Sequence, residues 1–126
     1  MKIKFVYGIF PALIFYTGWI KEGFAGVGNA MVIRIFPAHK DDEGLLQHVL
    51  THVKQAYRFL IIFHALLYLF NADYREAAEV EAYRKQLEYS GDKETDIARF
   101  AGFICAPSRY RLQLNQPDVE NMLREA

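Results

Sequence analysis

The feature that most constrains this chain is a pair of histidines four residues apart, His48 and His52, inside a helical pattern of apolar residues. In an α-helix, residues i and i+4 lie on one face, one turn apart, so both imidazoles can reach a single metal ion. At about 100° per residue, one arc of this helix is apolar and comprises Leu45, Leu46, Val49, Val53 and Ala56. The two histidines fall at the edge of that arc, where a half-buried helix lines a cleft.

A third ligand is needed before this pair can form a protein zinc site with one open position. The helix predicted over residues 74–89 carries four acidic residues, Glu76, Glu79, Glu81 and Glu88. On a helical wheel Glu79 borders the apolar arc, whereas Glu81 lies within the solvated arc. A carboxylate at the edge of the core is costly unless something satisfies it, and a metal ion would. We therefore expect His48, His52 and Glu79 to bind a metal, with Glu76 as the alternative to Glu79. The competing interpretation is an ordinary helix with two polar edge residues.

The remaining pattern predicts an α+β fold that is mostly helical, in a single domain spanning residues 1–126. Residues 23–36 are typical of an antiparallel hairpin, with strands at 24–27 and 31–36 around the turn pair Gly28-Asn29. Helices are expected from Glu43 to beyond Gln55, over 59–70, 74–89 and 94–105, and from Pro117. The apolar run 59–70 is expected to be a core helix, and its His64 a hydrogen-bonded core residue rather than a metal ligand.

Residues 5–20 form a nearly continuous apolar run. A membrane-spanning helix needs roughly 20 apolar residues, and this run is shorter and interrupted by Gly8, Pro11, Thr17 and Gly18. We expect a buried strand followed by a short helix that starts at Pro11. Association with a membrane through residues 5–20, or export, is the alternative.

Whole-chain composition excludes several classes of protein. Lys+Arg and Asp+Glu are both 15, so no basic field attracts nucleic acid. The single cysteine, Cys105, cannot form an internal disulfide and is expected to be a small buried residue, which favours a reducing cytoplasm. His39, in the charged loop 37–43, is expected to be exposed. Since 52% of the residues are hydrophobic, a non-catalytic module that binds a membrane or another protein is a second candidate class.

The chain resembles the core of small gluzincin metallopeptidases, of the minigluzincin size class, in Leu45-Leu46-Gln47-His48-x-Leu50-x-His52-Val53-x-Gln55 followed by Glu79-Val80-Glu81-Ala82-Tyr83. The resemblance covers about residues 23–87. It implies a zincin-like core, in which the hairpin packs on the HxxxH helix and a glutamate-bearing helix follows. It also implies Zn²⁺ held by His48, His52 and Glu79, and hydrolysis of a peptide or protein substrate by metal-activated water.

The chain departs from that family at Val49, where the family pattern places a glutamate as general base. Valine cannot accept a proton, so we expect the chain to fold, bind zinc and hydrolyse peptides very poorly. Two explanations stay open: a natural pseudo-enzyme, or an inactivated form whose parent carries glutamate at this position. Tyr83 or Arg75 is expected to stabilise an oxyanion, and the strand over 31–36 to pair with an extended substrate. The sequence indicates neither the substrate nor an oligomeric state.

Overall fold

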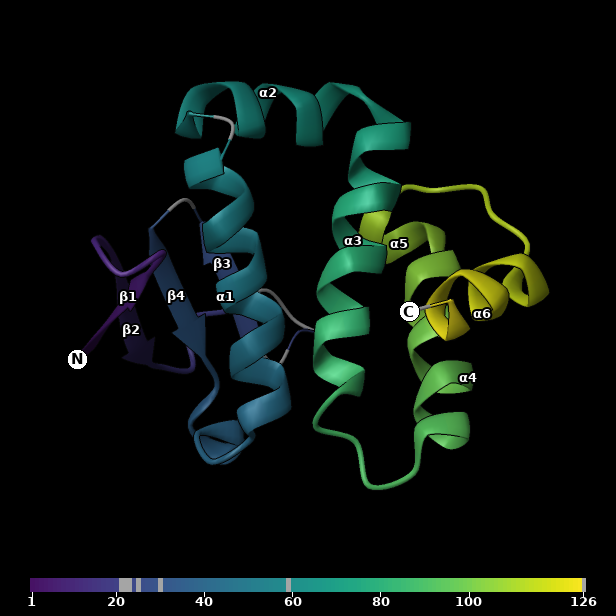
Figure 1. Ribbon diagram of the computed structural model, residues 1–126, viewed down its shortest axis with the longest axis horizontal. Coiled ribbons are helices and arrows are strands. Elements are labelled where there is room, and N and C mark those ends of the chain that lie inside the picture. The colour runs from purple at the N-terminus through teal and green to yellow at the C-terminus, as the bar shows by residue number, and fades with distance from the viewer. Residues whose placement is uncertain (21–23, 25, 30, 59, 126) are drawn as a thin grey trace.

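The computed structural model describes residues 1–20, 24, 26–29, 31–58 and 60–125. Helix α1 (Glu43–Arg58) separates two layers, with a four-stranded sheet on one side and the other long helices on the opposite side (Figure 1). The sheet contains β1 (Lys2–Val6), β2 (Phe10–Tyr16), β3 (Gly26–Asn29) and β4 (Val32–Ile35), in the order β1-β2-β4-β3. The prediction of an α+β, mostly helical fold is confirmed.

The first two strands take up most of the apolar N-terminal run. β1 and β2 pair antiparallel, with Phe5 opposite Pro11. The prediction of a helix starting at Pro11 is therefore wrong. β2 pairs in parallel with β4 only from Leu13 onward, so the missing N–H of Pro11 is not needed by that neighbour, and a proline near the start of a strand is tolerated. In the described part of the chain, no single helix is both long and apolar enough to cross a membrane. Taken together, α1 and the helix over 61–70 have sufficient length and apolar content, but the pair is bent by 112° at the break between them.

The predicted hairpin is present, since β3 and β4 pair antiparallel. Its turn lies later than expected, because Gly28 and Asn29 belong to β3; Gly23, Ala25 and Ala30 lie outside the described residues. β4 is bonded on both sides, by β2 and by β3. The prediction that the strand over 31–36 pairs with a substrate is therefore wrong, because the backbone groups that it would offer are already used within the sheet.

Helix α1 begins where expected, after a run of acidic residues. The Asp42 side chain accepts a hydrogen bond from the Leu45 backbone N–H at 2.9 Å, which satisfies one of the unpaired donors of the first turn. The apolar arc of α1 then packs on the inner face of the sheet. The fully or almost fully buried residues of this core are Val6, Ala12, Ile14, Ile33, Ile35, Leu46, Val49, Leu50 and Val53.

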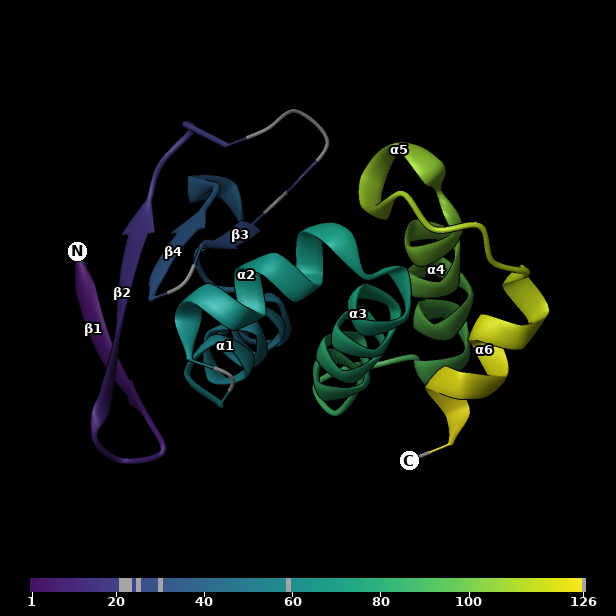
Figure 2. The same cartoon turned by 90° about the horizontal axis from the view of Figure 1, so that it is seen from above.

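A second core lies on the far side of α1. Helices α3 (Ala72–Leu87), α4 (Lys93–Cys105) and α6 (Gln116–Arg124) pack together there, with the short α5 (Pro107–Tyr110) between the last two; a 3-10 turn, Pro37–His39, precedes α1. The predicted stripe of α4 is buried and comprises Ile97, Phe100, Ala101 and Ile104. α3 lies alongside α1 in both views (Figures 1 and 2), and this contact sets the geometry of the site.

Helix α2 (Ile61–Phe70) contradicts the prediction of a core helix, because none of its residues is buried. It lies across the ends of α1 and α3 (Figure 2). Large apolar side chains point away from the protein: Ile62, Phe63, Leu66, Leu69 and Phe70, the last 82% exposed. The half-buried His64 and Tyr68 lie on the opposite face. In an ordinary surface helix the apolar side chains face the core and the polar ones face solvent, so the arrangement in α2 is the reverse. The high apolar content of residues 59–70 does not indicate which face is exposed.

Candidate metal centre

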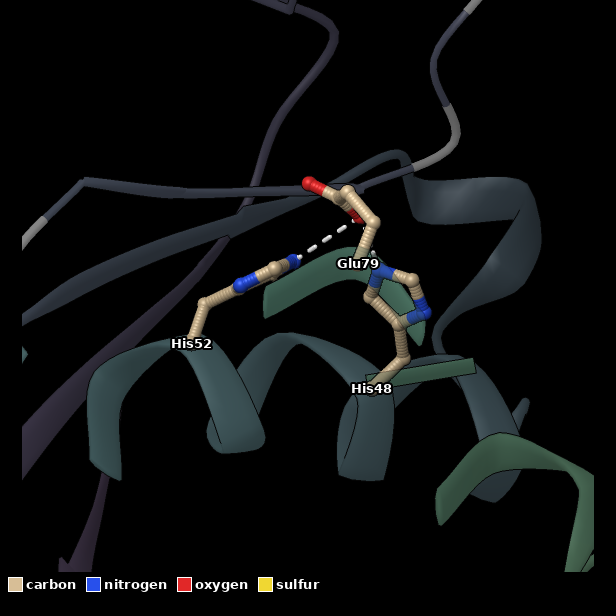
Figure 3. A group of neighbouring side chains, drawn as sticks. All are labelled: His48, His52 and Glu79. Atoms are coloured by element: carbon tan, nitrogen blue, oxygen red, sulfur yellow. Dashed lines mark hydrogen bonds and ion pairs between the residues drawn. The ribbon is translucent and has the colours of Figure 1, made fainter. Parts of the chain in front are cut away.

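The three predicted ligands meet between α1 and α3. Nε2 of His52 lies 3.3 Å from Oε1 of Glu79, and Nε2 of His48 lies 3.6 Å from the same oxygen. One ligand atom from each residue falls within 4.8 Å of the other two. Figure 3 shows both imidazoles extending from one face of α1 toward the carboxylate on α3. The wheel argument that preferred Glu79 to Glu81 therefore agrees with the structure, in which Glu79 is buried and Glu81 is exposed.

These distances suit a tetrahedral metal ion. Zinc bound at 2.0–2.1 Å with tetrahedral angles would place its ligand atoms about 3.3 Å apart. The two distances to Glu79 Oε1 are close to that value. The side chains present could therefore hold an ion, and both histidines would use the same type of nitrogen, Nε2.

The carboxylate of Glu79 is unusual because it is 1% exposed and still favours its charged form. Burial alone would raise its pKa, but the neighbouring His52 and His48 hold the pKa of Glu79 well below its usual range. Within the described chain, its hydrogen-bond and ion-pair partners are these two imidazoles and the Tyr68 hydroxyl. A buried anion is thus stabilised by groups that can themselves carry, or bind, positive charge.

The pKa values of the two histidines are shifted in opposite directions. Burial lowers the pKa of His48, and Glu79 opposes this shift only in part. Burial would also lower the pKa of His52, but the charge of Glu79 outweighs it and raises that pKa. A proton on His52 would neutralise Glu79, and Glu79 favours this protonated form. A metal ion would replace this proton, because a ligating imidazole must be neutral.

Gln55 fixes the orientation of His52. Its Oε1 lies 2.9 Å from Nδ1 of His52, while its Nε2 donates to the Ala78 carbonyl at 3.0 Å and to Glu81 at 2.6 Å. Because both donors of the amide are used by these oxygens, its oxygen must accept from His52, which leaves Nε2 directed at Glu79. This is the outer contact that metal-ligating histidines usually make. Gln55 belongs to the sequence motif around His48 and His52, but no role was predicted for it. Its spacing of three residues from His52, which places both side chains on one face of the helix, could have indicated this contact.

Tyr68 of α2 was also missed by the sequence analysis. Its hydroxyl donates a hydrogen bond to Oε2 of Glu79, so Oε1 remains for the histidines or a metal. Burial and the charge of Glu79 both raise the pKa of Tyr68, so the hydroxyl keeps its proton and remains a donor. Because α2 had been assigned to the core, nothing in the sequence placed this tyrosine beside Glu79.

A cavity of ≈190 Å³ adjoins the three residues. Val49 lines it directly beside His48 and is 1% exposed. Strand β3 runs close to this side chain, since a Cβ added at Gly28 would lie only 2.9 Å from Cγ1 of Val49, and one at Gly26 would lie 3.4 Å from Cγ2. Glycine at position 28 therefore allows β3 to pass close to α1 at Val49.

Neither of the two predicted oxyanion stabilisers, Arg75 and Tyr83, lines the cavity. Arg75 donates to the backbone carbonyls of Tyr110, Tyr68 and Arg111, so its guanidinium holds chain segments together and the prediction for it is wrong. The Tyr83 ring packs edge-on against His48, with centroids 4.3 Å apart, and its hydroxyl is hydrogen-bonded to the Tyr110 hydroxyl at 2.7 Å. Burial and Glu79 raise the pKa of Tyr83 to about 12. Tyr110, rather than Tyr83, lines the cavity.

The other candidate residues have simpler roles. His39 is exposed, as expected. Cys105 is half-buried, and burial raises the pKa of its thiol, which argues against an activated nucleophile. His64 makes the expected hydrogen bond, with Nδ1 2.7 Å from the Tyr74 hydroxyl, but it lines the cavity instead of the core.

One buried imidazole, one half-buried imidazole and one buried carboxylate thus form a group beside a cavity that could hold a metal ion. Comparison of the chain with models of protein families, with curated proteins and with solved structures gave no match.

Proposed function

We propose that this chain is a zinc-binding scaffold of the metallopeptidase type, in which Val49 replaces the general base. The observation that carries the proposal is the convergence of His48, His52 and Glu79 beside a cavity. Two imidazoles and a carboxylate, without a thiolate, are a ligand set typical of catalytic zinc. A peptide or protein is the substrate class that the sequence resemblance suggests.

The residues divide the work of such a site between them. A bound zinc ion would lower the pKa of a water molecule to about 7 and polarise a peptide carbonyl. His48, His52 and Glu79 hold the ion, Gln55 orients His52, and Tyr68 orients Glu79. Val49 can accept no proton, and general-base assistance is typically worth ~10²–10⁴-fold in rate. We therefore expect the chain as written to hydrolyse peptides only weakly.

The first test is the stoichiometry of metal binding. The purified chain, stripped with a chelator and titrated with Zn²⁺, should bind one ion per molecule in isothermal titration calorimetry, and elemental analysis should find the same ratio. At any pH at which His52 is protonated before binding, zinc should release that proton, because a ligating imidazole must be neutral; Glu79 raises the pKa of His52 and so extends this range to higher pH. If the chain binds no zinc, the proposed function is wrong.

Gln55→Leu should weaken zinc binding by about 10- to 100-fold, the usual cost of losing an outer partner of a ligating histidine. The leucine has a similar size but leaves Nδ1 of His52 without its acceptor. The matched control is Gln47→Leu on the same helix, since the Gln47 side-chain amide donates to the exposed Glu43 and makes no contact with the three candidate ligands among the described hydrogen bonds. Equal zinc affinities for the two variants would contradict the assigned role of Gln55.

The outward face of α2 favours a second candidate function, attachment to an anionic membrane surface. An exposed apolar patch of this kind commonly marks an interaction site. The patch contains no charged residue, and exposed arginines lie at both of its ends, Arg58 just before α2 and Arg111, whose side chain reaches the Leu69 carbonyl. Apolar side chains would enter the lipid boundary while the arginines meet phosphate groups.

Vesicles of mixed phosphatidylglycerol and phosphatidylcholine should therefore bind the chain in a flotation assay. Phe63→Ser combined with Phe70→Ser should reduce the partition coefficient by roughly tenfold or more, since each exposed phenylalanine would otherwise bury apolar area in lipid. Tyr89→Ser, which removes an exposed aromatic side chain beyond the other end of α3, is the control. If the native chain does not bind these vesicles, or if the native chain and the double phenylalanine variant bind them equally well, α2 is not a lipid-binding face.

A further inference from the structure

His64 is a titratable residue in the cavity wall that the proposed zinc site does not use. It belongs to α2, on the face that also carries Tyr68, and it lines the same cavity as Val49 and His52. Its ring is oriented by Tyr74, whose hydroxyl lies 2.7 Å from Nδ1. Tyr74 does not line the cavity, so the bond through Nδ1 leaves Nε2 as the nitrogen that can act inside it.

The position of His64 suits action on a water molecule rather than on a metal ion. His64 lines the cavity but lies outside the group of His48, His52 and Glu79, whose ligand atoms are all within 4.8 Å of one another. A proton acceptor for an attacking water has to lie in that outer position, because the water itself occupies the space between the acceptor and the ion. Burial, together with the nearby His52, also lowers the pKa of His64, which favours the neutral ring that a proton acceptor needs.

We propose that His64 is the proton acceptor of this site, in place of the residue at position 49. This inference rests on the proposed function. In the tautomer in which Nδ1 donates to the Tyr74 hydroxyl, the lone pair is on Nε2, the nitrogen that this bond leaves for the cavity. Val49 on α1 and His64 on α2 both line the cavity, so the loss of a base at position 49 does not leave the cavity without one.

The chemical step balances without any further reactant. An O–H bond of water breaks, its proton moves to Nε2, and the water oxygen forms a bond to the peptide carbon, while the carbonyl electron pair moves to oxygen. The C–N bond then breaks as that pair returns, and the imidazolium gives its proton to the departing amine. The products are a carboxylic acid and an amine, and His64 returns to its neutral form.

The test compares four zinc-loaded proteins: the native chain, His64→Gln, Val49→Glu and the double variant. His64→Gln should lower the weak native hydrolysis of an unstructured protein by roughly tenfold or more. In the Val49→Glu background the same change should have an effect of less than about threefold, because glutamate then accepts the proton. His39→Gln, an identical change at an exposed histidine, is the control, and circular dichroism and zinc affinity confirm that each variant is folded and loaded.

A second readout does not depend on turnover. In the Co²⁺-loaded protein, the pH midpoint of the visible absorption spectrum reports the ionisation of water at the site, and His64→Gln should move this midpoint to higher pH because it removes the acceptor. An unchanged or lowered midpoint would overturn the proposal, as would native activity that is undetectable or insensitive to His64→Gln. If Val49→Glu is active in those cases, only the role of His64 fails. If no variant binds metal or cleaves, the proposed function fails with it.

Discussion

Val49→Glu should raise zinc-dependent peptide hydrolysis by at least about 10²-fold over the native chain, the lower end of what a well-placed general base contributes. The new carboxylate would follow His48 directly on α1 and would face the cavity that Val49 lines now. Burial should raise its pKa toward neutrality, which suits a proton acceptor. The assay is cleavage of an unfolded protein substrate with and without a chelator, followed by mass spectrometry.

Val49→Gln is the matched control for this result. Glutamine has the size and shape of glutamate and packs equally against Gly26 and Gly28, but it cannot act as a base. Only the glutamate variant should gain activity, and o-phenanthroline should abolish the gain. If a folded, zinc-loaded Val49→Glu protein cleaves nothing across a broad peptide library, the peptidase interpretation has to be abandoned in favour of an interaction role.

Glu79→Gln should weaken zinc binding by more than about 100-fold, beyond the cost of losing an outer partner. The change keeps the volume of the side chain but removes the only carboxylate in the three-residue cluster. Glu81→Gln should weaken zinc binding much less, because Glu81 is exposed and its hydrogen bond toward the site goes to Gln55 and not to a ligand. Glu88→Gln, at an exposed residue paired with Lys85, should leave the affinity unchanged. Competition titrations with a chromogenic chelator would measure all three, and similar losses for Glu79→Gln and Glu81→Gln would show that Glu79 is not a ligand.

The candidate site was predictable from sequence because two helices carry it and helical periodicity is regular. The i, i+4 spacing of His48 and His52 fixed their common face, and the apolar arc of the next amphipathic helix separated Glu79 from Glu81. Only the approach of α3 to α1 remained to be found. Neither periodicity nor spacing could show that Gln55 reaches Ala78 and Glu81 of α3, because that contact depends on how the two helices pack.

The errors in the predicted fold come from elements whose environment is set by distant parts of the chain. A continuous apolar run looks the same whether it is buried or exposed, so α2 was assigned to the core and Tyr68 was not placed beside Glu79. Pro11 was assigned to a helix start because its strand environment depends on pairing with β1 and β4. The place of β4 between β2 and β3 likewise follows from a parallel pairing that no local pattern encodes.

The position of α2 determines how a metal ion would exchange with solvent. This helix forms one wall of the cavity through His64 and Tyr68, yet it contributes no residue to either hydrophobic core, and Leu60 enters it at a φ of 51°, a conformation that is strained for leucine. Segments with few buried apolar contacts open locally at a free energy far below that of global unfolding. Detachment of α2 would therefore remove one wall of the cavity while α1 and α3, which carry the three candidate ligands, stay packed together. We expect the exchange of a bound ion to depend on the local opening of this ten-residue helix more than on the global stability of the domain.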